Sequence, residues 1–194
     1  MTKEIKRCAW VTLDDLYVQY HDTEWGVPVY DDKKLFEFLI LESFQAGLSW
    51  ITILRKRENF RKAFDDFDFN KIALYNDEKF ESLMKDAGII RNRLKIKAAI
   101  SNAKEFIKVK KEFGSFSDYI WGFVNYKPTI NNFKTMKDVP AKTELSDEIS
   151  KDLKKRGFKF VGSTIIYSHM QATGMVNDHT TDCYRYEEIC NIIS

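Results

Sequence analysis

Apolar side chains recur at helical spacing along most of the chain. In residues 35–44 and 50–64 they fall three and four positions apart, which is typical of helices that bury one face. Asp31 or Asp32 can cap the first of these helices and Ser49 the second, because each side chain can accept hydrogen bonds from unpaired amides. The two segments are therefore predicted to be consecutive helices.

Further helices are predicted wherever a similar pattern has a residue that can begin or end it. They cover residues 78–86 (capped by Asp77 and followed by a left-handed Gly88), 91–113 (ended by Gly114), 146–156 (ended by Gly157) and 163–173 (ended by Gly174). Residues 158–161 are predicted to be extended, and residues 125–143 to form a loop. No alternating segment is long enough for a sheet, so the sequence predicts an all-α protein.

Composition limits the class of protein. The 194 residues are 44% apolar and 31% charged, which excludes a disordered or fibrous chain. No apolar run approaches the ~20 residues that span a bilayer, and the first residues lack the apolar core of a signal peptide. Neither repeats nor Pro/Gly-rich linkers divide the chain. We therefore expect one domain over residues 1–194, a cytoplasmic monomer with reduced cysteines.

The net charge of +2 conceals a segregation of sign. Residues 85–111 carry nine basic and two acidic side chains, and residues 151–159 carry five and one. These segments sum to +7 and +4, so the rest of the chain carries −9. Such segregation is typical of a surface that binds a polyanion, although solvated helix faces give the same pattern.

Cysteine and histidine residues form two pairs at opposite ends of the chain: Cys8 with His21, and His179 with Cys183. Two thiolates and two imidazoles suit a tetrahedral Zn²⁺, and with four protein ligands such a zinc would be structural. The alternative is a set of small buried cysteines and ordinary histidines. Cys190 and His169 belong to neither pair.

Residues 83–95 predict a junction between two helices, of which the second is basic. Unpaired amides at such a helix start can bind a phosphate group, as in a helix-hairpin-helix element that contacts DNA. Gly88, Ile89 and Arg91 are the candidate DNA-binding residues at this junction. An ordinary corner between two helices is the alternative.

Aromatic residues gather near one acidic residue in the first part of the chain: Trp10, Tyr17, Tyr20, Trp25 and Trp50, with Glu42 inside an apolar string. Aromatic rings can stack on a flipped-out base while a carboxylate reads its hydrogen-bonding edge. The alternative is an aromatic core in which a neighbouring donor satisfies Glu42. Gly47 marks a turn between the helix of Glu42 and the next one.

Several strings in one order resemble the DNA-3-methyladenine glycosylase I family. They are residues 8–10 (CAW), 20–28 (YHDTEWGVP), 41–52 (LESFQAGLSWIT), 86–91 (DAGIIR), 154–162 (KKRGFKFVG) and 176–179 (VNDH). The resemblance runs from about Cys8 to Cys183. It does not include residues 184–194, and the junction at residues 87–91 lacks the Gly-x-Gly form of the wider superfamily.

This resemblance implies an all-α helix-hairpin-helix DNA glycosylase fold, with a zinc site that joins the N- and C-terminal segments. The zinc ligands it implies are Cys8, His21, His179 and Cys183. The base pocket it implies consists of Trp10, Tyr17, Tyr20, Glu42 and Trp50, with Glu42 contacting the methylated adenine. The turn at Gly47 and Leu48 matches the element that enters the duplex where the base has left.

The expected reaction is hydrolysis of the N-glycosidic bond of 3-methyladenine in double-stranded DNA, which leaves an abasic site. N3 methylation makes the purine a cationic leaving group, and an ionised Glu42 would favour that cation over adenine. No lysine can be assigned to the pocket, so we expect a monofunctional enzyme without a lyase step. The alternative is a non-catalytic, zinc-stabilised DNA-damage-binding module. A small-molecule hydrolase would leave the basic segments unexplained.

Overall fold

The computed structural model describes residues 5–193. Its helices are α1 (Asp15–Thr23), α2 (Asp32–Gln45), α3 (Trp50–Ala63), α4 (Phe69–Ile72), α5 (Asp77–Lys85), α6 (Arg93–Phe113), α7 (Phe116–Gly122), α8 (Glu144–Lys155), α9 (Ser163–Ala172) and α10 (Tyr184–Ile193), with a 3₁₀ turn, η1 (Asp65–Phe67). Two short parallel strands, β1 (Thr129–Ile130) and β2 (Val176–Asn177), pair with each other. The predicted all-α class is confirmed.

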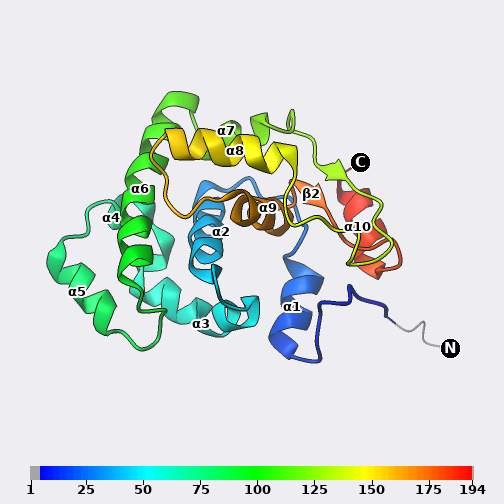
Figure 1. Cartoon of the computed structure of the whole chain (residues 1–194), viewed down its shortest axis with the longest axis horizontal. Helices are drawn as coiled ribbons and strands as arrows, with labels where there is room; N and C mark the ends of the chain where they lie inside the picture. Colours follow the sequence, from blue (N-terminus) through cyan, green and yellow to red (C-terminus); the bar gives the residue numbers. More distant parts are fainter. Residues whose placement is uncertain (1–4, 194) are drawn as a thin grey trace.

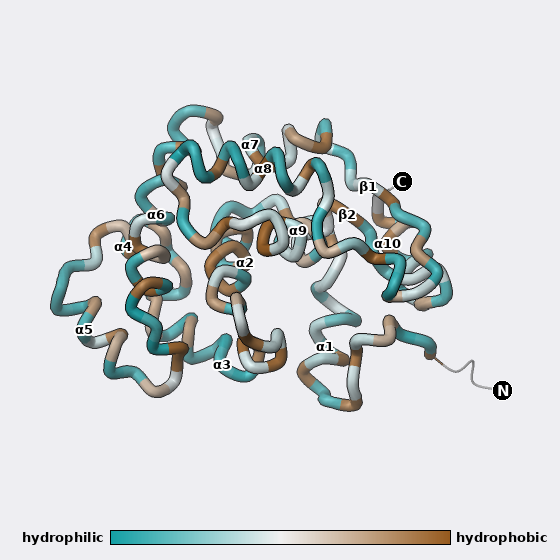
Figure 2. Tube along the Cα trace, in the orientation of Figure 1, coloured by the Kyte–Doolittle hydropathy of each residue, from teal (hydrophilic) through white to brown (hydrophobic). Residues whose placement is uncertain are grey.

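Helix α2 lies at the centre of the molecule (Figure 1). Each of the ten residues from Leu35 to Phe44 is buried, including two glutamates and a serine. Helices α3, α6, α7 and α9 all pack against it, and the hydropathy colouring shows its apolar character (Figure 2). A helix surrounded in this way must be apolar on nearly every side, so any polar side chain that it carries needs a specific explanation.

The predicted helix ends are confirmed in part. Asp31 caps α2 by accepting a hydrogen bond from the amide of Lys34. Ser49 precedes α3 as predicted, but its hydroxyl bonds the side chain of Thr52 and caps no amide. Helix α5 starts one residue earlier than predicted, because Asn76 caps it.

Two local predictions are wrong. Gly88 does not end a helix in the left-handed conformation, since α5 already ends at Lys85 and Gly88 has no positive φ. A Cβ atom there would lie 2.9 Å from a carboxylate oxygen of Asp86 and 3.2 Å from Cβ of Asn59, so close packing explains the glycine. Residues 158–161 are not extended but form a turn in which Phe160 has φ +53°.

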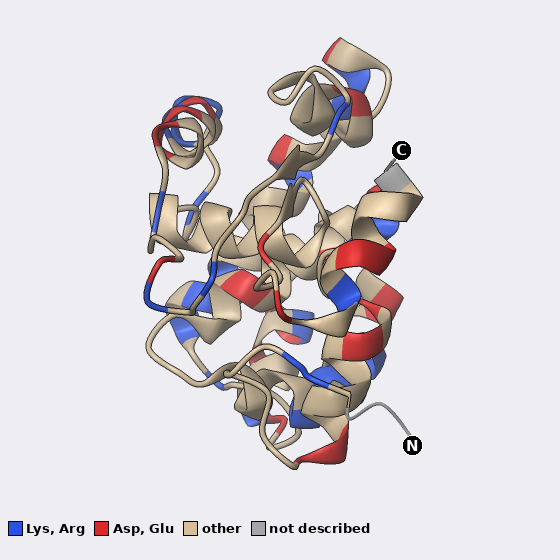
Figure 3. Cartoon of the chain, turned by 90° about the vertical axis from the view of Figure 1, so that its right-hand side faces the viewer, with Lys and Arg blue, Asp and Glu red and all other residues tan. Residues whose placement is uncertain are grey.

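The basic helix α6 lies on the opposite side of the molecule from α10, which has an acidic residue in its first turn (Figure 1). On the side that carries α10, acidic and basic residues are interspersed (Figure 3). No helix within residues 5–193 has both the length and the apolar character needed to cross a bilayer.

His169 is a buried polar group that the fold does not satisfy. Its side chain on α9 is fully buried, and neither ring nitrogen has a hydrogen-bond partner among the described residues. Burial without a partner lowers the pKa of His169 to about 4, because the charged imidazolium is disfavoured away from water.

We therefore expect His169→Phe to stabilise the protein more at acidic than at neutral pH. The unfolded imidazole binds a proton below about pH 6.5 while the native one stays neutral, so wild-type stability falls as the pH decreases. The free energy of unfolding of the variant, minus that of the wild type, should rise by about 2 kcal/mol from pH 7.5 to pH 5. Urea unfolding at both pH values measures this difference, and an unchanged difference would contradict the prediction.

Candidate active site and metal-binding cluster

A cavity of about 310 Å³ opens between α1, the end of α2, the start of α3 and α9. It is lined by Trp10, Tyr17, Tyr20, Trp25, Glu42, Gln45, Ser49, Trp50, Met136, Ser168 and Gln171. All five residues predicted for the base pocket are in this set. Segments that are distant in sequence thus meet around one cavity.

Aromatic rings form the walls of the cavity. The ring of Trp10 meets those of Tyr17 and Trp25 edge to face, with centroids 5.6 and 5.2 Å apart. The rings of Tyr20 and Trp50 are 5.3 Å apart, and the Tyr17 hydroxyl accepts a hydrogen bond from the amide of Ile51. These contacts hold the rings in place before any ligand arrives, so the cavity is a preformed site for a flat apolar group.

Glu42 brings a carboxyl group into these apolar surroundings. Its side chain is 4% exposed, and no described residue donates a hydrogen bond to it. Burial raises the pKa of Glu42 to about 8, because a charged carboxylate is poorly solvated there. A carboxyl group with this pKa is mainly protonated at neutral pH, whereas an ionised Glu42 beside a cationic base is expected from the sequence.

Five lining residues were missed by the sequence reasoning: Gln45, Ser49, Met136, Ser168 and Gln171. Met136 comes from the loop that follows β1, which no pattern assigns to the cavity. Ser168 and Gln171 lie three positions apart on α9, so the helical spacing alone could have placed them on one face. Only the packing of α9 against α2 shows that this face meets Glu42.

Gly47 and Leu48 form the exposed turn between α2 and α3, beside Ser49 of the cavity wall. Gly47 has φ +81°, and Leu48 is 40% exposed. The buried ammonium group of Lys95 donates hydrogen bonds to the carbonyl oxygens of Phe44 (2.8 Å) and Ala46 (2.6 Å). Lys95, predicted as part of a basic surface, thus satisfies the end of α2 and fixes the start of this turn.

The junction between α5 and α6 offers fewer unpaired amides than predicted. The amides of Gly88 and Ile89 donate to Asp86, and Asn92 accepts hydrogen bonds from the amides of Leu94 and Lys95. The side chain of Ile89 is buried, whereas Arg91 is exposed. The amides of the two candidate residues Gly88 and Ile89 are therefore already occupied.

A second junction, between α8 and α9, differs in this respect. Helix α9 begins after Gly162 without a side-chain cap. Asn102 of α6 holds the preceding turn through two hydrogen bonds to the backbone of Lys159, and Ser43 of α2 donates to the carbonyl of Phe160. Lys97 and Lys159 line one groove on this face, so the two basic segments meet here.

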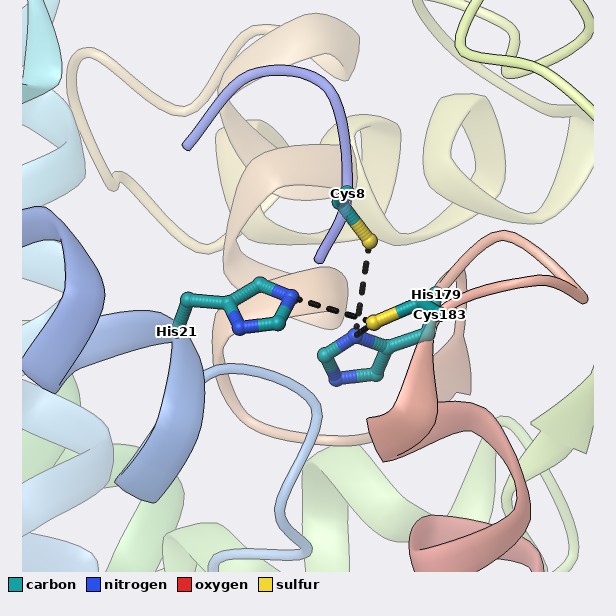
Figure 4. A group of neighbouring side chains, drawn as sticks. All are labelled: Cys8, His21, His179 and Cys183. Atoms are coloured by element: carbon teal, nitrogen blue, oxygen red, sulfur yellow. Dashed lines mark hydrogen bonds between the residues drawn. The ribbon is translucent and has the colours of Figure 1, made fainter. Parts of the chain in front are cut away.

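Cys8, His21, His179 and Cys183 form a buried cluster that joins the two ends of the chain (Figure 4). Their ligand atoms all lie within 4.8 Å of one another. The Sγ of Cys183 is 3.4 Å from Nε2 of His21 and 3.6 Å from Nδ1 of His179, which lies 3.5 Å from Sγ of Cys8. Four ligands around one tetrahedral ion would be about 3.3–3.8 Å apart, so this donor set fits a single metal ion.

The outer nitrogens of both histidines face oxygen acceptors. Nδ1 of His21 lies 2.8 Å from the carboxylate of Asp22, and Nε2 of His179 lies 3.1 Å from the carbonyl of Trp25. These contacts leave Nε2 of His21 and Nδ1 of His179 unprotonated toward the cluster, as metal ligation requires. Gly26 packs on this histidine, since a Cβ atom there would lie 3.0 Å from Nε2 of His179.

A mostly helical protein with an aromatic cavity at a buried carboxyl group, and with a groove lined by two lysines, has the parts that a DNA glycosylase needs to hold a flipped-out base. Residues 10–186 match the family described as methyladenine glycosylase. The chain belongs to this family.

Two relatives cover nearly the whole chain. The DNA-3-methyladenine glycosylase 1 of Escherichia coli (strain K12) is 53% identical over 182 residues, which is 94% of this chain and 97% of the relative. The DNA-3-methyladenine glycosylase of Haemophilus influenzae is 49% identical over 177 residues, 91% of this chain and 96% of the relative.

Solved structures agree with this assignment. A crystal structure of 3-methyladenine DNA glycosylase I has a TM-score of 0.90 at 52% identity. The match covers 92% of this chain and 98% of the chain in that structure. A structure that describes 3-methyladenine recognition by the enzyme from Staphylococcus aureus has a TM-score of 0.90 at 38% identity. The match covers 94% of this chain and 97% of the chain in that structure.

The unpaired carboxyl group of Glu42 should destabilise the fold at alkaline pH. The unfolded group loses its proton near pH 4.5 and the native one near pH 8, so stability falls as the pH rises between these values. Relative to the wild type, Glu42→Gln should gain about 3 kcal/mol of unfolding free energy between pH 5.5 and pH 8. Denaturant unfolding at the two pH values measures this gain.

Glu37 provides the matched control on the same helix. It is also buried, but it accepts hydrogen bonds from Arg57 (2.6 Å) and Arg61 (2.7 Å). Glu37→Gln should therefore destabilise the protein, because removing one partner leaves a buried charge poorly compensated. The prediction for Glu42 is wrong if the unfolding free energy of Glu42→Gln, relative to the wild type, does not rise between about pH 5.5 and pH 8.

Proposed function

We propose that this protein excises 3-methyladenine from alkylated double-stranded DNA by hydrolysis of the N-glycosidic bond. The observation that carries the proposal is Glu42, a buried carboxyl group without a donor, placed at a cavity walled by aromatic rings. The relatives named for 3-methyladenine support the choice of base.

Charge explains how the cavity would select the lesion. N3 methylation makes the purine cationic while it is attached to deoxyribose, and adenine itself is neutral. A cation beside Glu42 favours the ionised carboxylate and lowers its pKa from about 8. Binding of the methylated base is then coupled to loss of the Glu42 proton. Neutral adenine gives no such compensation, so it is held by stacking alone.

The reaction needs little further chemistry from the protein. The bond between C1′ and N9 breaks, and its electron pair neutralises the purine, which leaves as 3-methyladenine. Water supplies a hydroxyl group to C1′ and releases one proton, so an abasic site remains. The described lining residues include no lysine that could form a Schiff base, which supports a monofunctional enzyme without a lyase step.

DNA would reach the cavity across the face that carries the α8–α9 junction. The uncapped start of α9 and Lys159 supply the donors for one strand. The exposed Leu48, next to Gly47, would fill the space that the base leaves in the stack. Arg91 remains a candidate for a further phosphate contact. The amides of Gly88 and Ile89 are not candidates, because they already donate hydrogen bonds to Asp86.

The four-residue cluster would hold one structural Zn²⁺. Two thiolates and two imidazoles are the donors of such sites, and with all four positions supplied by protein no site is open to substrate. The carboxylate of Asp22 accepts a hydrogen bond from Nδ1 of His21 and another, of 2.7 Å, from the guanidinium group of Arg7. Ligands and supporting groups thus come from both ends of the chain.

Glu42→Gln should lower the release of 3-methyladenine from alkylated DNA by about 10- to 100-fold. This loss corresponds to the ~1.5–3 kcal/mol of a hydrogen bond to a charged group. The measurement is chromatography of the bases released by purified protein. Glu58→Gln, which alters an exposed carboxylate on α3, is the matched control and should keep wild-type release. Undiminished release by the Glu42 variant would remove its assigned role.

The same assay separates the enzyme from the non-catalytic damage-binding module. Wild-type protein that binds alkylated DNA and releases no base would be such a module. The preformed cavity and the family assignment favour the enzyme.

Elemental analysis should find about one zinc per chain. Cys183→Ser should lose the metal and lower the melting temperature, because metal binding contributes directly to folding where ligands come from distant segments. Cys190→Ser is the control, since Cys190 lies outside the cluster, and it should keep both zinc and stability. Full zinc content in the Cys183 variant would exclude this ligand.

A further inference from the structure

Gln171 is a lining residue whose orientation is fixed from behind. It lies on α9, and its carboxamide Nε2 donates a hydrogen bond of 2.8 Å to Oδ2 of Asp178. Its backbone carbonyl accepts a hydrogen bond from the amide of Gly26, which ties this part of α9 to the segment that follows α1. The residue is therefore held at both its backbone and its side chain.

Asp178 can act only as an acceptor toward Gln171. Asp178 is 1% exposed. Its carboxylate also accepts hydrogen bonds from the Tyr167 hydroxyl (2.6 Å) and from the side-chain amide of Asn131 (2.7 Å). Because a carboxylate has no hydrogen to donate, Gln171 must present Nε2 to it. The carboxamide cannot turn over without placing two acceptors against each other.

The remaining atom, Oε1 of Gln171, receives no hydrogen bond from the described residues, and Gln171 lines the cavity. The cavity thus contains an acceptor that cannot become a donor. The hydroxyl groups of Ser49 and Ser168 lack this restriction because they can donate or accept. Glu42 is not restricted to accepting either, because a protonated carboxyl group can donate or accept a hydrogen bond.

We infer that Gln171 selects the base by its exocyclic amine, and that Asp178 is the positioning residue that keeps Oε1 toward the cavity. An amino group at purine position 6 donates to this oxygen, whereas an oxo group there would meet it as a second acceptor. The inference rests on the proposed function. It assigns to Gln171 the distinction between amino and oxo purines, and leaves to Glu42 the distinction between cationic and neutral ones.

The test is binding of two free bases, 3-methyladenine and 3-methylhypoxanthine, followed by the fluorescence of the tryptophans in the cavity. Wild-type protein should prefer 3-methyladenine by ~10-fold or more, since an unpaired buried acceptor is costly. Gln171→Leu should reduce this preference to within ~3-fold. Gln171→Met, of similar length, should give the same result and is the second variant if the first does not fold.

Two variants separate positioning from general damage. Asp178→Asn lets the carboxamide turn over, so it should reduce the preference while Gln171 is intact; its zinc content is measured because His179 is adjacent. Tyr167→Phe removes another donor to Asp178 but keeps its pairing with Gln171, so it should retain the wild-type preference. A wild-type preference in both Gln171 variants overturns the inference. Failure of the wild-type protein to release 3-methyladenine from DNA would instead overturn the proposed function.

Discussion

The burial of residues 35–44 of α2 is the constraint on which the rest of the structure depends. The surrounding elements shield this part of the helix from bulk water, so each polar side chain on it must be paired or carry a cost. Glu37 is paired with two arginines, and Ser43 donates to the carbonyls of Leu39 and Phe160. Glu42 alone among the helix's buried carboxyl groups lacks a donor. The core therefore supplies the free energy that keeps this carboxyl group in the cavity.

The same helix sets the position of the surfaces around the cavity. Lys95 of α6 bonds the carbonyls at its C-terminal end, which orients the Gly47–Leu48 turn. Ser43, adjacent to Glu42, bonds the turn that leads into α9. Helix α2 thus positions three features: the carboxyl group, the exposed leucine and the α8–α9 junction. Such support matters because a reactive arrangement loosened by one ångström loses much of its effect.

Sequence reasoning located α2, α3, α5, α6, α8 and α9 and five of the residues that line the cavity, because these depend on local patterns or on strings shared with a family. It did not predict α1, α4, α7 or α10. It failed where tertiary contacts decide. Gly88 was assigned to a helix end, but the close approach of Asn59 explains it. Lys95 was counted as a surface charge, yet its ammonium group serves α2. Helical spacing could have paired Gln171 with Ser168 on one face, but its role depends on Asp178, which accepts its hydrogen bond, and on the cavity that it lines together with Glu42.

The four-residue cluster is in contact with the aromatic wall of the cavity, which explains why the chain ends meet at this place. The N-terminal end supplies two cluster residues close in sequence to aromatic wall residues: Cys8 precedes Trp10 by two positions, and His21 follows Tyr20. His179 contacts the Trp25 ring at 4.6 Å between centroids and faces its carbonyl. The aromatic wall that the N-terminal segment contributes to the cavity would open if that end frayed. A metal ion held by the four residues would join this segment to the C-terminal one, and none of the four residues lines the cavity.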